Sequence, residues 1–251
     1  MVKKVKAALI IIGDEILSGR TEDANLNHLA IWLGGLGIIL DEVRVIPDVG
    51  QRIIHTVNEC RCSFDYVFTT GGIGPTHDDI TAESVAKAFD VPLLLNEEAR
   101  GLLEDNMGKG NLTEARLRMA RIPEGASLIR NPVSSAPGFQ MENVFVMAGI
   151  PVVMQSMLLD VENRISGGAE ILSKAIHVFE GESLFAQMLG EIEECFEHLS
   201  VGSYPFYKAG KYGASFVLRS PVKADLDDAL KDLKKRITNR GSDYFDGEAP
   251  E

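Results

Sequence analysis

The sequence has few cysteines and no apolar stretch of membrane length. Cys60, Cys62 and Cys195 are too few for a disulfide framework, so we expect free thiols in a reducing compartment. The longest early apolar run, 7–12, is much too short to serve as the core of a signal peptide. These absences predict a cytoplasmic protein with no membrane partner.

Positive charge is also scarce. The 251 residues carry 25 Lys and Arg against 37 Asp and Glu, a formal net charge of -12, with no Lys/Arg-rich run. We therefore expect no nucleic-acid partner, because non-specific nucleic-acid binding depends on a basic surface. An anionic ligand would have to be held locally, by loops, helix ends or a cation. With 45% apolar residues, the chain can hold one large domain or two modest ones.

Apolar segments alternate between strand and helix patterns over the first two thirds of the chain. Continuous or alternating apolar runs predict strands at 5–12, 38–46, 65–70 and 143–147, with a short apolar run at 91–95. Helical spacing predicts helices at 25–36, 49–61, 81–89, 97–107, 113–120 and 151–163. Such alternation is typical of a doubly wound α/β domain, which we place at residues 1–165.

Beyond Ser166 the order of elements changes. Strands are expected at 171–179, 200–207 and 212–219, and helices with one apolar stripe at 183–196 and 224–237. This β-α-β-β-α order predicts a small α+β domain at 170–240, followed by a frayed tail at 241–251. The run 210–213 has the Gly-x-x-Gly spacing of a loop that clamps RNA, but here it joins two strands, which predicts a hairpin.

The thirteen residues from Thr69 to Thr81 combine a strand end, a glycine-rich turn, two carboxylates and a helix start. Glycines at 71, 72 and 74 let backbone amides approach an anion, and the helix adds its own N-terminal amides. Asp78 and Asp79 would repel a bare phosphate, so the pattern favours a divalent cation, Mg²⁺, Mn²⁺ or Co²⁺, between carboxylate and phosphate. The alternative is a plain strand-to-helix turn with an Asp N-cap.

This segment resembles the signature of the molybdopterin-binding fold of the MoaB/Mog type, in the form found in the N-terminal part of CinA-type proteins and in FAD synthases. Further motifs follow in the family's order at 13–20 (Gly-Asp-Glu-Ile-Leu-Ser-Gly-Arg), 23–25 (Asp-Ala-Asn), 131–132 (Asn-Pro) and 136–139 (Ala-Pro-Gly-Phe). The resemblance implies a three-layer α/β domain with a mostly parallel sheet, followed by a small KH-like domain. The run 148–152, Ala-Gly-Ile-Pro-Val, departs from the family's Pro-Gly-x-Pro-Ser and lacks its hydroxyl.

The resemblance implies three possible functions. CinA-type and FAD-synthase-type members look like metal-dependent hydrolases of a nucleotide pyrophosphate such as ADP-ribose or FAD, and the Thr-His-Asp-Asp form with the second domain favours this branch. The first alternative is a protein that binds or adenylylates molybdopterin, and the second is a non-catalytic ligand-sensing module. Full-length CinA proteins carry a further amidohydrolase domain, for which 251 residues leave no room, so no nicotinamide-nucleotide deamidase activity is expected.

Relatives of this fold are commonly dimers or trimers. The resemblance therefore implies a homo-oligomer, with a dimer preferred and a trimer as the alternative. Leu158, Leu159 and Val161, at the end of an expected helix, are candidates for its apolar surface.

The resemblance also assigns roles to individual residues. Asp79 and Asp48 match two functional aspartates of Mog-type relatives and are expected to be catalytic, with a helix cap and a turn residue as the alternatives. We expect Asp78 and Asp79 to divide metal binding and helix capping between them. His77 is a rim residue, and the absence of a second nearby His does not favour zinc. Expected phosphate or pterin contacts are Gly13, Asp14, Glu15, Ser18, Gly19, Arg20, Asn25, Gly71, Gly72, Ile73, Gly74, Pro75, Thr76 and Gly138.

Overall fold

The computed structural model describes residues 5–108, 110–208 and 210–247, so the end of the expected tail, 248–251, lies outside the described residues. The chain divides into two units, each with its own core: unit 1 at residues 1–168 and unit 2 at residues 169–251. Within the described ranges, no helix has both the length and the apolar character needed to span a bilayer.

Unit 1 is built on a six-stranded sheet in the order β2-β1-β3-β8-β7-β6. The first four strands are parallel, and β7 is antiparallel to both of its neighbours, β8 and β6, so the sheet is mixed. β1 lies between two neighbours and its residues from Ala7 onward are buried, as expected for a central strand covered on both faces. The strands are β1 (Val5–Ile12), β2 (Ile38–Ile46), β3 (Tyr66–Thr70), β6 (Ser127–Ile129), β7 (Gly138–Met141) and β8 (Val144–Met147).

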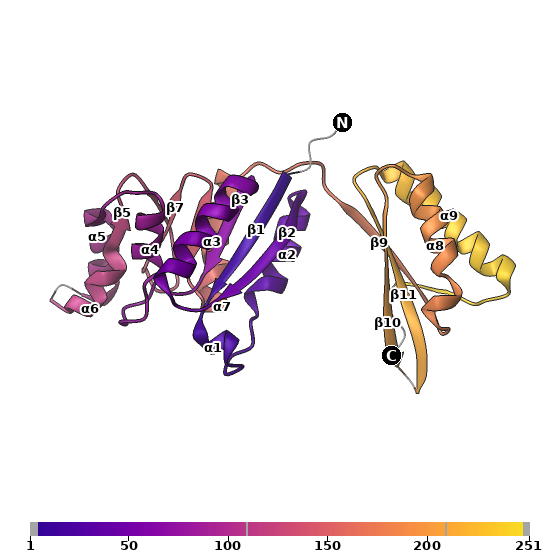
Figure 1. Cartoon of the computed structure of the whole chain (residues 1–251), viewed down its shortest axis with the longest axis horizontal. Coiled ribbons are helices and arrows are strands. Elements are labelled where there is room, and N and C mark those ends of the chain that lie inside the picture. The colour runs from indigo at the N-terminus through magenta and orange to yellow at the C-terminus, as the bar shows by residue number, and fades with distance from the viewer. Residues whose placement is uncertain (1–4, 109, 209, 248–251) are drawn as a thin grey trace. The chain divides into compact units, whose positions relative to one another are not determined.

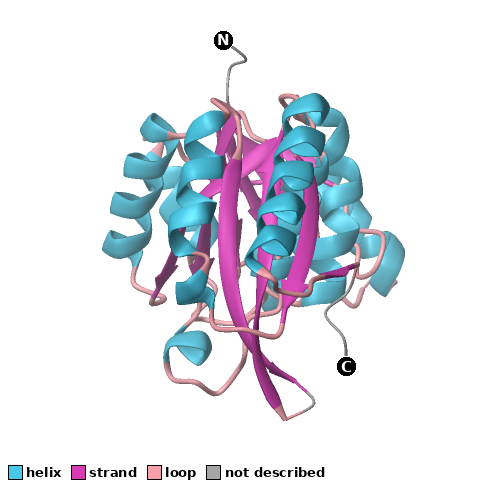
Figure 2. Ribbon diagram, turned by 90° about the vertical axis from the view of Figure 1, so that its right-hand side faces the viewer, coloured by secondary structure: helices cyan, strands magenta, loops and turns pink. Residues whose placement is uncertain are grey.

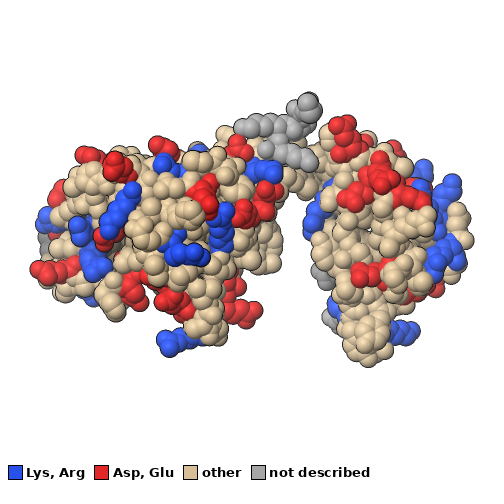
Figure 3. All heavy atoms as spheres, in the orientation of Figure 1, with Lys and Arg blue, Asp and Glu red and all other residues tan. Residues whose placement is uncertain are grey.

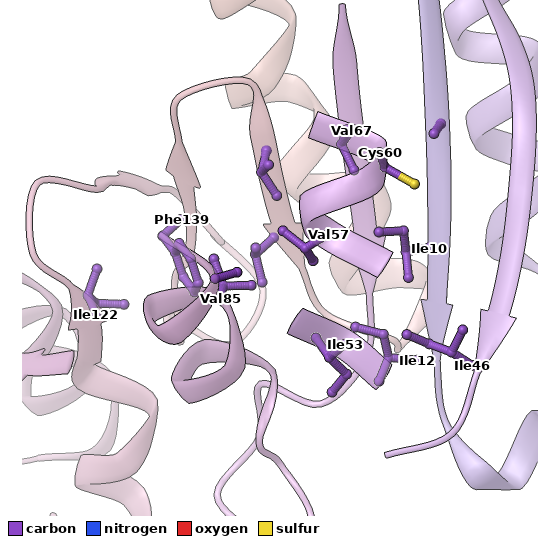
Figure 4. Close-up of a cluster of buried hydrophobic side chains, with 14 of the residues drawn as sticks. Ile10, Ile12, Ile46, Ile53, Val57, Cys60, Val67, Val85, Ile122 and Phe139 are labelled. Atoms are coloured by element: carbon purple, nitrogen blue, oxygen red, sulfur yellow. The ribbon is translucent and has the colours of Figure 1, made fainter. Parts of the chain in front are cut away.

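Helices cover both faces of this sheet and make three layers (Figure 1). α3 (Gly50–Ser63) and α4 (Thr81–Ala88) pack on one face, and α2 (Asn25–Gly35) and α7 (Pro151–Val161) on the other. Figure 4 shows the first of these two cores, in which Ile53 and Val57 of α3 lie beside Ile12 and Ile10 of β1. The alternation of β1 side chains between two helix layers explains why its buried part, Ala7 to Ile12, is apolar throughout.

A small subdomain follows α4 in unit 1. β4 (Leu93–Leu95) pairs with β5 (Arg121–Pro123), and α5 (Glu97–Met107) and α6 (Glu114–Leu117) lie between them in the chain. The predicted helix 113–120 is partly wrong, because its last turn is the 3₁₀ segment η1 (Arg118–Ala120). Strands β5, β6 and β7 were not predicted, since runs of three or four residues contain too few alternations to show a period of two.

The end of α7 does not supply the expected apolar surface. Leu158 and Val161 are buried in the core against the sheet, and only Leu159 is exposed. The expectation that these three residues form one surface is therefore wrong, because the apolar stripe of α7 faces the sheet. α7 is followed by the 3₁₀ segment η2 (Glu162–Arg164).

Unit 2 contains an antiparallel sheet in the order β10-β11-β9-β12. Helices α8 and α9 pack on this sheet and share its hydrophobic core (Figure 2). The predicted hairpin is confirmed, because β10 and β11 pair from Ser200 and Arg219 to Lys208 and Lys211. The elements are β9 (Leu172–Val178), η3 (Glu182–Leu184), α8 (Ala186–Cys195), β10 (Ser200–Lys208), β11 (Lys211–Ser220), α9 (Lys223–Arg240) and β12 (Phe245–Asp246).

The segment after Gly241 is partly ordered, so the expectation of a frayed tail is wrong for its first residues. Phe245 and Asp246 form β12 and pair with His177 and Ile176 of β9. The ring of His177 is buried and reaches Ser215 Oγ at 2.7 Å and the Gly247 carbonyl oxygen at 2.6 Å. Sequence patterning missed this strand because only two residues pair.

Charge of both signs is interspersed on the surface of each unit in the face that Figure 3 shows. Most of the ion pairs join partly exposed side chains, such as Lys174 with Asp227. Such pairs contribute little to stability. The surface is therefore acidic overall without a large basic patch on the visible face, in keeping with the net charge of -12.

Candidate functional site

The four parallel strands of unit 1 deliver their C-terminal loops to one edge of the sheet. Two backbone hydrogen bonds join neighbouring strands just past their ends: Gly13 N donates to Ile46 O and Gly71 N donates to Met147 O, each at 3.2 Å. Ligands of open α/β sheets bind at this carboxyl edge. The loops that meet there follow β1, β2, β3 and β8.

The turn after β3 can be built only from glycine at its first two positions. Gly71 has φ +103° and Gly72 has φ +66°, a region that other residues rarely adopt. A Cβ on Gly71 would lie 2.1 Å from Ile12 O, and one on Gly72 would lie 2.2 Å from Thr81 Oγ1. Thr81, the first residue of α4, donates from its amide to Gly72 O and from its hydroxyl to Gly71 O, both at 3.0 Å. The turn is thus tightly fixed against β1 and α4.

Three consecutive amides of this turn lack an acceptor. Within the described residues, no hydrogen bond is donated by the N–H groups of Gly72, Ile73 and Gly74. The three residues are half-buried and line a cavity. Because partly buried backbone donors are normally paired, successive unpaired amides of a glycine turn are the arrangement expected of an anion site.

Thr76 connects the two carboxylates that follow the turn. Its amide donates to Asp79 Oδ2 at 2.8 Å, and its hydroxyl lies 2.5 Å from both Asp79 Oδ2 and Asp78 Oδ1. One hydroxyl hydrogen serves one acceptor at a time, so the two carboxylates compete for it. The hydrogen bond from Thr76 is the main reason why the pKa of Asp78 lies below its ordinary value.

Neither aspartate caps α4. The N-cap residue is Ile80, and no side-chain oxygen accepts from the first turn there. The expectation that Asp78 or Asp79 caps this helix is therefore wrong, because the chain between Thr76 and Asp79 folds back on itself instead. Asp79 Oδ1 has no hydrogen-bond partner among the residues that the structure describes, which leaves it open to a ligand.

Asp48 joins the loops after β1 and β2. Its Oδ2 accepts from the amide of Asp14, the first residue of α1 (Asp14–Leu17), at 2.9 Å. Its carboxylate also approaches the glycine turn, because a Cβ on Gly72 would lie 3.6 Å from Asp48 Oδ1. Burial raises the pKa of Asp48, and the negative charges of Glu15 and Asp14 add to this effect, while the hydrogen bond from Asp14 opposes it. Asp48 thus joins the loops after β1 and β2 at a position where burial disfavours its charged form.

An open cavity of about 460 Å³ lies at this edge of the sheet. Its volume falls within the range of small-molecule sites, about 300–1,000 Å³. One wall is apolar, with Ile150 and Val153 from the start of α7, and the other carries Glu15 and Asp79. The residues lining it are Glu15, Thr21, Gly71, Gly72, Ile73, Gly74, Pro75, Asp79, Met119, Asn131, Ser134, Ala136, Ala148, Gly149, Ile150, Pro151 and Val153.

Some expected contacts lie elsewhere. Ser18, Gly19 and Arg20 are exposed at the end of α1 and are not among the described residues that line the cavity. Gly138 is buried in β7, where a Cβ would lie 2.3 Å from Val146 O. Glycine is required here because β7 lies close to β8. Gly138 therefore has a structural role in place of the expected ligand contact. His77 is almost fully exposed at the tip of its loop.

Asn25, at the start of α2, links the loop after β8 to this edge. Its Nδ2 donates to Gly149 O at 2.7 Å, while its Oδ1 is buried without a partner in the described parts of the chain. The Oγ1 atoms of Thr69 and Thr70, at the end of β3, are likewise buried and unpaired there. Unsatisfied polar atoms therefore gather near the ends of the parallel strands, where a ligand or water would be needed to pair with them.

The described residues of the site do not form a complete set of protein ligands for a metal ion. Across the described residues there is no group of three His, Cys, Asp or Glu side chains placed to hold a metal ion. Mg²⁺, however, is usually bound by one or two carboxylates together with phosphate oxygens of the substrate. Asp78 and Asp79, joined by Thr76, can supply these carboxylates. The donors thus fit a cation that arrives with a phosphate ligand and do not fit a structural zinc site.

Several residues at the site carry no local sequence signal. Asn131 and Ser134 lie in an irregular loop, and Met119 belongs to η1. Asn131 was noted only as part of a motif, and no pattern marked Ser134 or Met119. Met119 reaches the cavity through the subdomain after α4, and Asn131 and Ser134 reach it through the loop after β6, and periodicity reports neither approach.

Comparisons with known proteins agree with this architecture. Residues 8–166 match the family described as a probable molybdopterin binding domain, and residues 170–245 match the FAD synthase middle domain. A protein of Archaeoglobus fulgidus is 32% identical over 92% of this chain and 98% of its own length. A CinA-like protein of Kosmotoga olearia is 30% identical over 97% of this chain, which spans only 61% of that protein.

A solved structure is similar to unit 1. The crystal structure of a protein CinA of unknown function from Thermoplasma acidophilum matches with a TM-score of 0.61 and 32% identity. The match covers 64% of this chain and 98% of that structure.

Proposed function

Because this chain belongs to the molybdopterin-binding domain family and has CinA-like relatives, we propose that it is a nucleotide pyrophosphatase supported by a divalent cation, with an ADP-ribose or FAD type of substrate. One observation carries the proposal: three unpaired amides, Gly72 to Gly74, lie on the same cavity as the Asp79 carboxylate. Amides that bind phosphate oxygens beside a carboxylate suit attack of water on a phosphorus atom.

Hydrolysis of a pyrophosphate link adds the oxygen of water to one phosphorus and leaves the other phosphate as the departing group. The amides of Gly72, Ile73 and Gly74 donate to the oxygens on which negative charge increases. Asp79 Oδ1, which is free of the Thr76 interaction, accepts a proton from the attacking water or holds the cation. The cation, when bound, supplies positive charge to the phosphate oxygens and lowers the pKa of water.

Asp48 has a positioning role in this proposal. It fixes α1 through the Asp14 amide and stands close to Gly72, so it keeps the loop after β1 against the glycine turn. Its raised pKa shows that this arrangement is costly for a charged carboxylate. A carboxylate whose pKa is raised by burial, beside a ligand cavity, is typical of functional sites.

Incubation of the protein with ADP-ribose or FAD under Mg²⁺, Mn²⁺ or Co²⁺, followed by measurement of AMP release, tests the proposal. Asp79→Asn removes the charge and keeps the shape, and should lower turnover by about 100-fold or more with little change in nucleotide affinity. Asp105→Asn, at an exposed position of α5, is the matched control and should retain full turnover. Full activity of Asp79→Asn would contradict the assignment.

Molybdopterin binding is the alternative function. It is favoured by the apolar wall of the cavity, Ile150 and Val153, which suits a planar ring. No AMP release from any nucleotide, together with tight binding of molybdopterin, would move the conclusion to this alternative.

A further inference from the structure

Two arginines lie beside the glycine turn, on the segment that joins α6 to the sheet strand β5. Arg118 of η1 and Arg121 at the start of β5 line a recess of about 40 Å³ together with Gly72–Gly74 and Asp79. Gly72–Gly74 and Asp79 also line the large cavity. The recess and the cavity therefore meet at the glycine turn, with the arginines on the side away from α7.

Both guanidinium groups are exposed and uncommitted. Within the described residues, neither Arg118 nor Arg121 has a side-chain hydrogen bond or ion pair, whereas the neighbouring Arg116 donates to Asn111 O at 2.7 Å. Arginine keeps its charge at any physiological pH, and its fork of donors matches the oxygens of a phosphate. In the part of the chain that the structure describes, the recess thus holds two arginines without a hydrogen bond or close ion pair beside three unpaired amides, and the carboxylates Glu83 and Asp79 line it as well.

The nearby carboxylates already have partners. Glu83 is paired with Lys87 at 2.7 Å, and Asp78 and Asp79 bind Thr76. After the Thr76 hydrogen bond, which is the larger cause, the charges of His77 and Arg118 also lower the pKa of Asp78. The field of Arg118 thus reaches the end of the turn, although its guanidinium is not bound by any of these carboxylates.

Size decides which part of a ligand enters the recess. At about 40 Å³ it is far below the volume of a small-molecule site, so it can accept only a small terminal or bridging group. We propose that Arg118 and Arg121 bind one phosphate of a diphosphate ligand here while the amides of Gly72–Gly74 bind the other. The site then takes diphosphate esters in preference to monophosphates. This inference rests on the proposed function and names the residues that select its substrate class.

The test compares ADP-ribose with AMP, by calorimetric titration of the full chain in the presence of Mg²⁺. The unchanged protein should bind ADP-ribose about 10- to 100-fold more tightly than AMP, the range expected for one or two charge-assisted hydrogen bonds. Arg118→Gln with Arg121→Gln should abolish this preference and leave AMP affinity within about threefold. Arg116→Gln, two positions before Arg118 and bound to Asn111, is the matched control and should keep the preference.

Turnover provides a second readout. In AMP release from ADP-ribose, the double variant should raise KM by a factor similar to its loss of affinity, with a smaller change in kcat, because the arginines position the ligand and do not touch the reacting water. Arg118→Lys with Arg121→Lys should recover part of the loss, since charge is retained and only the forked geometry is missing.

The outcomes separate this inference from the proposed function. An unchanged preference in the double Gln variant overturns the inference, and so does an equal loss for AMP and ADP-ribose, which would indicate a general loss of positive charge. A lower thermal midpoint with an unchanged preference would show that the arginines only balance nearby acids. Tight, selective binding of ADP-ribose without AMP release supports the arginine assignment and refutes hydrolysis. Binding of neither nucleotide overturns both.

Discussion

The two units differ in whether their buried polar side-chain atoms are hydrogen-bonded and in whether non-glycine residues adopt a positive φ. In unit 1 the described residues include buried unpaired side-chain oxygens at Asn25, Thr69 and Thr70, and non-glycine residues with positive φ at Asp90, Ser135 and Glu142. Over the described part of unit 2, neither feature occurs. His177, its buried titratable residue, has a partner at each ring nitrogen.

This difference follows from topology. Parallel strands must return through helices, so their loops collect at one edge and leave donors that no neighbouring strand can pair. The antiparallel hairpin of unit 2 pairs its strands over nine positions and has no such convergence. Buried side-chain oxygens without a partner thus occur in unit 1, near the ends of its parallel strands, and none is found in the described part of unit 2.

The largest expected effect is on the glycine turn of unit 1. Gly71→Ala should destabilise unit 1 by up to about 6 kcal/mol, because a positive φ costs about 1–3 kcal/mol and the overlap with Ile12 O costs a similar amount. Thermal or urea unfolding measures the loss. Gly210→Ala in the unit 2 hairpin is the matched control, since its φ of +73° is similar but a Cβ there meets open space. Equal losses in the two variants would contradict the idea that the first turn is sterically fixed.

A cavity in the core of unit 2 should test whether the units are separable. Phe216 is fully buried against Phe185, with ring centroids 5.1 Å apart, and Phe216→Ala should cost about 3–5 kcal/mol. The loss should appear as an earlier unfolding transition of unit 2, while ADP-ribose affinity stays unchanged at temperatures below it. Loss of nucleotide binding under conditions where unit 2 is still folded would show that unit 2 contributes to nucleotide binding.

The smallest expected effect concerns Asp48. Because burial raises its pKa, the charged folded form is disfavoured, and Asp48→Asn should raise the thermal midpoint at pH 7 while lowering turnover. The penalty is present in full above the folded pKa, declines as the pH falls from that pKa to the ordinary value, and is absent below the ordinary value, where the acid is protonated in both states. The gain in midpoint should therefore shrink on acidification. A gain that is independent of pH would exclude the carboxylate charge as its cause.

Sequence patterns located most long elements and the centre of the site. β2 and α5 begin and end where periodicity places them, and the glycine turn lies on the cavity as its spacing suggests. A strand or helix that spans two or more repeats of its own period contains enough information to be recognised alone.

The rest of the site depends on contacts between distant segments. Asp48 supplies the acceptor for the first amide of α1, 34 positions away, and nothing in the local sequence indicates that pairing. Arg118 lies in the predicted helix 113–120, but in the structure it begins the 3₁₀ segment η1 directly after α6. Tertiary packing overrides local propensity in such short segments. Contrary to the expectation, Asp78 and Asp79 do not cap α4, because tertiary packing also overrides local propensity in the loop before this helix.

The two-residue strand β12 has a consequence for handling the protein. It pairs with β9 only at Ile176 and His177, and beyond them the outer edge of β9 has no strand partner among the described residues. An open strand edge is a template for pairing with another chain, and a charged residue such as Lys174 discourages this. Proteolysis after Gly241 would remove β12 and lengthen the bare edge. The cleaved protein should then aggregate through the β9 edge, even though its hydrophobic core stays intact.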